Sequence, residues 1–236
     1  MLIAGFPAGS WAANCYVVAT GPGTECLVVD PGQDAAVGVA DIVAEHRLKP
    51  VAVLLTHGHV DHMWSVTPVS GAYDATAWIH PADRHLLADP MAGLSRESAA
   101  MLLGGRYEFA EPDDVAELDD GQRLELAGLE VFVDHTPGHT QGSVTFRAPY
   151  DDDGASAVMF SGDLLFEGSI GRTDLPGGDH ATMLHTLRAK VLTLPDDVAV
   201  LPGHGGQTSI GRERATNPFL RQLTDGESAG HVTRGL

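Results

Sequence analysis

Four residues of types that bind metal ions lie within one short stretch of the sequence. His57, His59, Asp61 and His62 follow directly after the continuous apolar run 51–55. Residues two apart in an extended chain point the same way, so His57 and His59 can reach one ion, while Asp61 and His62 are close enough to serve a second. Imidazole and carboxylate are standard ligands of zinc, iron and manganese. The stretch therefore predicts a metal site, whereas packing alone would not explain four such residues in six positions.

Four ligands do not complete two coordination shells, so further ligands must come from other parts of the chain. Three later segments each place a ligand-type residue in a glycine-containing loop after an expected strand. These residues are His139 in Pro137-Gly138-His139, Asp163 in Ser161-Gly162-Asp163 and His204 in Pro202-Gly203-His204. Proteins of the α/β class build sites at such loops. The neighbouring His135 could in addition form a hydrogen bond to one of the ligands.

Short strands and helices alternate along the chain, and this pattern predicts the α/β class. The expected strands cover 14–20, 25–29, 51–55, 75–79, 124–126, 129–133, 144–147, 158–160 and 198–201, and the expected helices cover 34–47, 81–88, 95–103, 179–194 and 210–223. No Ser/Gly/Pro-rich linker divides them, so we expect one domain over residues 1–236. The segments 51–58 and 198–205 are identical at six of eight positions, and each is a strand that ends in a His-Gly loop. This echo suggests two similar halves that face each other.

Taken in order, these loops resemble the motifs of the metallo-β-lactamase superfamily, and most of all its glyoxalase II-type hydrolase branch. The resemblance spans roughly residues 14 to 206. It implies a four-layer αββα sandwich with the active site at the edge between the two sheets. By position, it also implies that His57, His59 and His139 hold one metal ion, that Asp61, His62 and His204 hold a second, and that Asp163 bridges the two.

The resemblance implies a hydrolase with two divalent metal ions, zinc being the first expectation and iron or manganese the alternatives. Two cations about 3.5–4 Å apart lower the pKa of a shared water toward 7 and polarise a carbonyl oxygen. Asp61 and Asp163 would be the catalytic carboxylates, with Asp61 orienting the hydroxide. The expected substrate is a thioester of a small hydroxy acid with a low-molecular-weight thiol. A thiolate leaves with a pKa near 8.5, so it needs little help from a general acid.

The segment Gly171-Arg172-Thr173-Asp174 bears on the choice of thiol. Glutathione-dependent members of the branch have a basic residue near Arg172 and an aromatic hydroxyl near Asp174, so Arg172 fits as a substrate-binding residue and Asp174 does not. Alternatively, Arg172 forms a structural salt bridge with Asp174. The same segment occurs in persulfide dioxygenases, which would use one iron held by His57, His139 and Asp163. A non-catalytic metal-binding domain of the same fold is a third hypothesis.

Charge and composition exclude several other functions. The net charge of −18 repels phosphate backbones and anionic lipids, so we expect neither nucleic acid nor a membrane as a partner. Lactam cleavage is disfavoured because no cysteine stands at a ligand position and no export signal is evident. Cys15 and Cys26 lie in apolar segments and are expected to be buried thiols. We therefore expect a cytoplasmic enzyme acting on a small molecule, with its oligomeric state left open.

Overall fold

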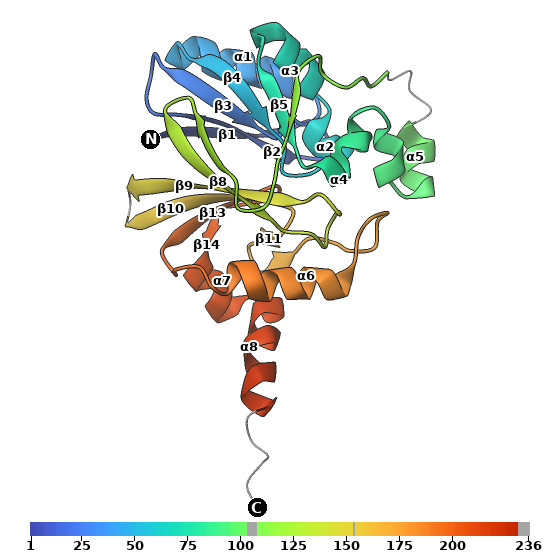
Figure 1. Ribbon diagram of the computed structural model, residues 1–236, viewed down its shortest axis with the longest axis vertical. Coiled ribbons are helices and arrows are strands. Elements are labelled where there is room, and N and C mark those ends of the chain that lie inside the picture. The colour runs from blue at the N-terminus through green and yellow to red at the C-terminus, as the bar shows by residue number, and fades with distance from the viewer. Residues whose placement is uncertain (103–107, 153, 231–236) are drawn as a thin grey trace, which may run out of the picture.

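Four layers of helices and strands make up the fold, as the sequence resemblance implies (Figure 1). The computed structural model describes residues 1–102, 108–152 and 154–230. The first sheet has the order β1 (Leu2–Ala8), β2 (Ala13–Ala19), β3 (Glu25–Val29), β4 (Lys49–Leu54), β5 (Thr76–Ile79) and β6 (Val115–Glu117). The second sheet has the order β14 (Thr208–Ser209), β13 (Val198–Pro202), β10 (Ala155–Gly162), β9 (Val144–Asp152), β8 (Leu129–His135) and β7 (Arg123–Leu126). The two sheets pack face to face, with helices on both outer faces.

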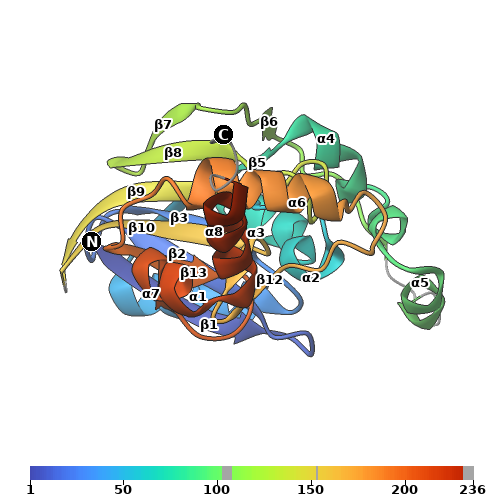
Figure 2. The same ribbon diagram turned by 90° about the horizontal axis from the view of Figure 1, so that it is seen from below.

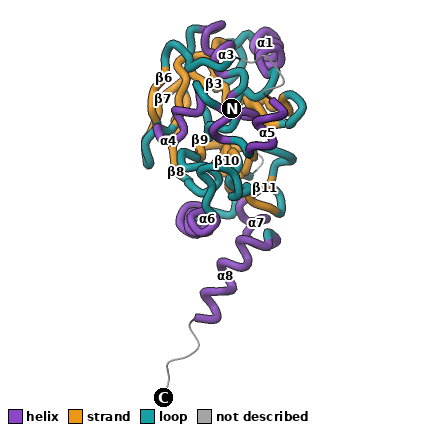
Figure 3. Tube along the Cα trace, turned by 90° about the vertical axis from the view of Figure 1, so that its right-hand side faces the viewer, coloured by secondary structure: helices purple, strands orange, loops and turns teal. Residues whose placement is uncertain are grey.

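The helices divide between the two outer layers. On the side of the first sheet lie α1 (Ala35–His46), α2 (Val60–Met63), α3 (Val66–Tyr73), α4 (Pro81–Arg84) and α5 (Arg96–Leu102), with the 3₁₀ turns His85–Leu87 and Pro90–Gly93. On the side of the second sheet lie α6 (His180–Thr186), its π-helical continuation Leu187–Val191, α7 (Ile210–Thr216) and α8 (Pro218–Gly230), as seen in Figure 2. Figure 3 shows that α8 leaves the body of the protein. No helix in the described ranges has both the length and the apolar character needed to cross a membrane.

Three hydrophobic clusters fill the three spaces between these four layers. Strand side chains alternate between the two faces of a sheet, and β2 shows this directly. Cys15 and Val17 pack toward helices α1 and α3, while Tyr16 and Val18 pack into the space between the sheets. A third cluster joins the second sheet to α6, α7 and α8. The central strands are buried on both faces, which explains their nearly continuous apolar sequence.

Most of the expected elements are present, and the differences have local causes. Strand β1 was not among the expected elements, and its sequence contains Gly5 and Pro7; at the edge of a sheet a proline costs no ladder hydrogen bond. The single helix expected over 210–223 is wrong, because it breaks into α7 and α8 at Asn217, which is extended before Pro218. Residue 103, the end of the helix expected over 95–103, lies outside the described residues. The two thiols are buried and unbonded to each other, as expected.

A buried carboxylate on α4 links the loops that the two sheets contribute to the predicted metal site. Asp83 is 2% exposed. Its Oδ2 accepts hydrogen bonds from the Gly58 amide at 2.9 Å and the Thr140 hydroxyl at 2.6 Å, and its Oδ1 accepts one from the Gly142 amide at 2.7 Å. Gly58 belongs to the first-sheet loop and the other two donors to the loop between β8 and β9. Asp83 therefore fixes the distance between His57 or His59 and His139.

Replacing Asp83 with Ala should lower the free energy of unfolding by about 3–5 kcal/mol, because two buried amides and a hydroxyl lose a charged acceptor. Urea unfolding followed by circular dichroism measures the change. The matched control is Asp89→Ala, which removes an exposed carboxylate six residues further along that makes no side-chain cap. This control should change stability by less than about 0.5 kcal/mol. Equal effects of the two substitutions would contradict the linking role of Asp83.

Candidate metal centre

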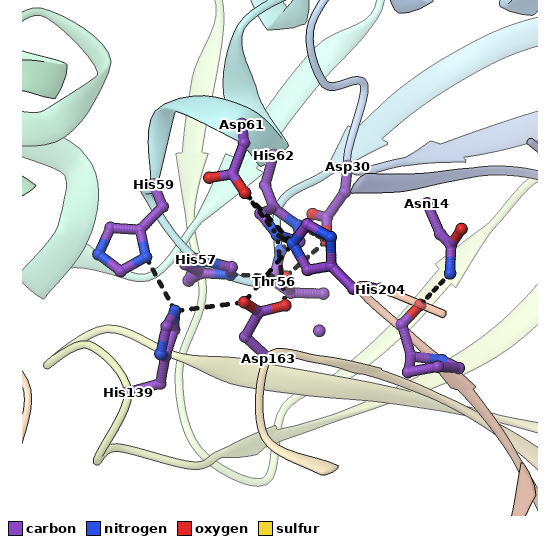
Figure 4. Close-up of polar contacts among 12 residues, drawn as sticks. Asn14, Asp30, Thr56, His57, His59, Asp61, His62, His139, Asp163 and His204 are labelled. Atoms are coloured by element: carbon purple, nitrogen blue, oxygen red, sulfur yellow. Dashed lines mark hydrogen bonds and ion pairs between the residues drawn. The ribbon is translucent and has the colours of Figure 1, made fainter. Parts of the chain in front are cut away.

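The seven predicted ligand residues come together at one edge of the interface between the two sheets (Figure 4). The ligand-type atoms of one group all lie within 4.8 Å of one another, and so do those of a second group. The first group is His57, His59 and His139, and the second is Asp61, His62 and His204. They come from the loop after β4 with helix α2, from the loop after β8 and from the loop after β13. This division is the one that the sequence resemblance implies.

Asp163 lies between the two groups. Its Oδ1 is 3.3 Å from His62 Nε2, and its Oδ2 is 3.5 Å from His139 Nε2 and 3.8 Å from His204 Nε2. The side chain is 12% exposed. One carboxylate therefore faces ligand-type nitrogens of both groups, which is the geometry required of a bridging ligand.

Asp30 determines how the first loop presents its histidines. This residue directly follows β3, and its carboxylate accepts hydrogen bonds from the Thr56 amide at 2.8 Å and the Thr56 hydroxyl at 2.6 Å. His62 Nδ1 lies 3.0 Å from the same carboxylate and donates to it, so its Nε2 faces the site. Because the Thr56 hydroxyl donates to Asp30, it accepts from His57 Nδ1 at 3.1 Å. The network thereby leaves His57 Nε2 unprotonated.

Asp30 was not predicted from the sequence as a site residue. The segment Asp30-Pro31-Gly32 indicates a turn, and a single carboxylate 27 positions before the histidine pattern gives no local signal of contact with it. Asp30 also lies within 4.8 Å of His57 and His62. Because its oxygens already accept from Thr56 and His62, we interpret it as a support for the ligands.

His139, in the loop after β8, is oriented by a backbone carbonyl of another segment. His139 Nδ1 donates to the Arg172 carbonyl at 2.7 Å, so its Nε2 carries the lone pair, 2.8 Å from His59 Nδ1. Gly171 lets these segments approach, since a Cβ there would lie 1.8 Å from the Asp163 carbonyl oxygen. The sequence pattern Gly171-Arg172 thus has a structural reason that is independent of the Arg172 side chain.

The loop after β13 is tied to the first sheet. Asn14 Nδ2 donates to the carbonyls of Pro202 and Gly205, each at 3.0 Å, and the buried Tyr16 hydroxyl donates to Pro202 at 2.7 Å. A Cβ on Gly203 would lie 2.3 Å from Asp163 Oδ1, so glycine is required beside the bridging position. These contacts bring His204 to 3.2 Å from both Asp61 Oδ2 and His62 Nε2.

Electrostatics differ between the two groups. Burial, with the neighbouring histidines, holds the pKa of His57 well below its ordinary value and lowers the pKa of His59 to about 3. Burial also opposes a proton on His62, but Asp163 and Asp61 outweigh it and raise the pKa of His62 well above the ordinary value. His57 and His59 are therefore held neutral, while the second group attracts positive charge.

A divalent cation fits both groups. His57 Nε2 is buried and has no hydrogen-bond partner among the described residues, and Asp163 Oδ1, also buried, faces His62 Nε2 at 3.3 Å. A buried polar atom without a partner is costly, and several lone pairs directed at one point repel one another. Three neutral imidazoles, and two imidazoles with carboxylates, are donor sets suited to zinc, iron or manganese. The residues present can thus hold the two ions that the sequence predicts.

A cavity of about 750 Å³ opens over this cluster. The ligand-type residues that line it are His59, Asp61, His139, Asp163 and His204. One wall is the hairpin β11 (Leu165–Phe166) and β12 (Ser169–Ile170). The fully buried Glu213 of α7 accepts from the Gly168 amide at 2.8 Å, and Asn217 donates to the Ser169 carbonyl at 3.0 Å. The carboxyl-terminal helices therefore position a wall of the cavity.

Arg172 also lines the cavity, as expected of a substrate-binding residue. Its guanidinium nevertheless binds Asp174, with Nε to Oδ1 at 2.7 Å and Nη2 to Oδ2 at 2.8 Å. The alternative of a salt bridge is therefore present in the structure, and a substrate-binding role for Arg172 stays a prediction.

His135 does not contact the seven ligand-type residues. It stacks on His80 with ring centroids 4.1 Å apart, and its Nε2 donates to the Gln141 carbonyl at 2.9 Å. The suggested hydrogen bond from His135 to a ligand is therefore absent from the contacts of this described residue.

Curated relatives cover nearly the whole chain. An uncharacterised protein of Mycobacterium tuberculosis is 50% identical over 95% of this chain and 100% of its own length. A probable metallo-hydrolase of Bacillus subtilis is 36% identical, and a hydroxyacylglutathione hydrolase of Haemophilus influenzae is 31% identical, each over 91% of this chain and 95% of its own length.

Solved structures of similar chains share the fold. A structure described as the BLEG-1 B3 metallo-beta-lactamase superposes with a TM-score of 0.79 at 37% identity, covering 93% of this chain and 99% of that chain. The protein TTHA1623, crystallised in a di-iron-bound form, superposes with a TM-score of 0.72 at 39% identity, covering 91% of this chain and 98% of that chain. The family model of the metallo-beta-lactamase superfamily matches residues 8–204. With its two facing sheets and converging ligand loops, this chain belongs to the metallo-beta-lactamase superfamily.

Proposed function

We propose that the protein hydrolyses a thioester between a small hydroxy acid and a low-molecular-weight thiol, using two divalent metal ions. The observation that carries the proposal is the second ligand group, with His204 Nε2 at 3.2 Å from Asp61 Oδ2 and Asp163 between the groups. Its completeness argues against a non-catalytic domain. The hydroxyacylglutathione hydrolase of Haemophilus influenzae, 31% identical over almost the full length, supports the thioester substrate.

The seven ligand-type residues would divide between the two ions. His57, His59 and His139 would hold the first ion, Asp61, His62 and His204 the second, and Asp163 both. Two such ions supply a water of lowered pKa and polarise the substrate carbonyl. The Asp61 carboxylate is 22% exposed and lines the cavity, so it can orient the attacking water by accepting a hydrogen bond from it. A thiolate leaves without general-acid assistance, so the chemistry requires no further acid.

Metal content and substrate turnover should agree. Protein purified without chelator should carry about two equivalents of divalent metal by elemental analysis and should hydrolyse S-lactoylglutathione or another lactoyl thioester. The likeness to a di-iron-bound protein makes iron a candidate beside zinc and manganese. One equivalent of iron, together with oxygen uptake on a thiol persulfide, would favour a persulfide dioxygenase and overturn the proposal.

Asp61→Asn and His62→Ala each test the need for the second group. Each should reduce thioester hydrolysis by more than about 100-fold, because even residues that support a ligand contribute 10- to 100-fold. Metal content should fall from about two equivalents to about one. The matched control is His185→Ala on α6, which removes an exposed histidine outside the cavity. Retention of full hydrolytic activity by His62→Ala would show that one ion suffices.

β-Lactam hydrolysis is the second candidate. The structural likeness to a B3 metallo-beta-lactamase at 37% identity favours it. A chromogenic cephalosporin assayed beside the thioesters separates the two, and we expect kcat/KM to be at least about 100-fold higher for the thioester. The reverse order would replace the thioesterase proposal.

A further inference from the structure

The cavity over the metal centre is lined by few positively charged side chains. Among the described residues that line it, Arg172 is the one arginine or lysine. The remaining wall combines apolar side chains with hydroxyl and amide groups. Its apolar members include Trp11, Phe166 and Ile170, and its uncharged polar members include Gln33, Ser98 and Ser169. Such a wall suits a ligand with few charges.

The single cation is already paired. Both Nε and Nη2 of Arg172 donate to the two carboxylate oxygens of Asp174, in the two-pronged geometry that a substrate carboxylate would otherwise use. The hydrogen bonds from Arg172 lower the pKa of Asp174 to about 2, so the carboxylate is ionised at neutral pH. A carboxylate of the substrate would therefore have to displace an identical group that is attached two residues away.

Exposure of the pair does not remove this effect. The side chains of Arg172 and Asp174 are 60% and 69% exposed, so their ion pair is weak and can open. When it opens, the Asp174 charge stays beside the guanidinium and continues to repel an incoming anion. The backbone at Arg172 is held in place, because its carbonyl accepts a hydrogen bond from His139 Nδ1 at 2.7 Å. The pair of Arg172 and Asp174 therefore stays beside the cavity.

The polar groups of the wall offer uncharged partners instead. The Ser10 amide and hydroxyl both donate to Gln33 Oε1 at 2.8 Å, and the Gln33 side chain lines the cavity, so its NH₂ group can donate to a ligand there. Ser98 and Ser169 add hydroxyl groups that both donate and accept. Amides and hydroxyls of a ligand can pair with all of these. The net charge of −18 further disfavours anions.

We propose that the thiol carrier of the substrate is an uncharged molecule rich in hydroxyl and amide groups, and that Asp174 is a specificity residue acting against carrier carboxylates. This proposal rests on the proposed thioesterase function and specifies its substrate class. Glutathione, with two carboxylates and one ammonium group, is then a poor carrier for this enzyme.

Two thioesters with the same acyl group test the proposal on the metal-loaded full-length protein. S-lactoylpantetheine carries an uncharged carrier with hydroxyls and amides, and S-lactoylglutathione carries an anionic one. We expect kcat/KM to be at least about tenfold higher for the pantetheine thioester. A preference for S-lactoylglutathione would overturn the proposal while leaving the thioesterase function intact.

Asp174→Asn separates repulsion from orientation, because the two roles predict opposite signs. If Asp174 repels carrier carboxylates, the substitution shifts the ratio of kcat/KM about fivefold toward S-lactoylglutathione. If Asp174 instead holds Arg172 ready for glutathione, the ratio shifts the other way. Asp41→Asn, which removes the same charge from the exposed side of α1, should leave the ratio unchanged. A shift of equal size in both variants would mean that total charge, and not Asp174, sets the preference.

Binding measurements keep the two proposals distinguishable. If neither thioester is hydrolysed, the thioesterase proposal fails, and calorimetric titration with S-methylpantetheine and S-methylglutathione then tests carrier preference alone. Tighter binding of S-methylpantetheine, with weaker discrimination in Asp174→Asn, supports the role of Asp174. Tighter binding of S-methylglutathione contradicts it.

Discussion

The structure is organised around a concentration of imidazole nitrogens and carboxylate oxygens where water is scarce. His57 Nε2 is buried without a hydrogen-bond partner, and His59 and His139 present nitrogens 2.8 Å apart. Such a cluster repels itself unless positive charge occupies its centre. The fold must therefore hold the cluster together before any cation binds. Asp30 and Asp83 do this with hydrogen bonds that the backbone loops alone could not make.

The two sheets share the work of building the centre. The first sheet contributes the loop after β4 and the supporting carboxylates, and the second contributes the loops after β8, β10 and β13. The close approach between these loops requires glycine at positions 171 and 203, because a side chain on Gly171 or Gly203 would collide with Asp163. The internal echo between 51–58 and 198–205 matches this arrangement, because β4 and β13 lie in opposite sheets and both end in a ligand loop. The ligand loops after β4 and β13 occupy corresponding positions in the two sheets. This placement, more than the sequence similarity, explains how two neighbouring ions could be held.

The sequence predicts the parts of this site that have a local pattern. A buried strand followed by His57, His59, Asp61 and His62 is such a pattern. It is the first of the motifs that resemble the metallo-β-lactamase superfamily, and this resemblance implies the four-layer sandwich. Asp30 and Asp83 were missed because each is a lone acid in a turn or at a helix start, and its partners lie 25 to 59 positions away. Strand β1 forms at the edge of a sheet, and the helix break at Asn217 is caused by Pro218. The periodicity of apolar residues indicates neither feature. Long-range hydrogen bonds are thus what the sequence conceals.

We expect two metal ions in this cluster, one in each ligand group, with Asp163 between them. Anomalous scattering from crystals of protein purified without chelator, recorded on both sides of the zinc, iron and manganese edges, can locate them. Two peaks about 3.5–4 Å apart are expected. One should lie among His57, His59 and His139 and the other among Asp61, His62 and His204. A single peak confined to one group, with the side chains of the other group turned away from it, would show that the cluster does not hold two ions.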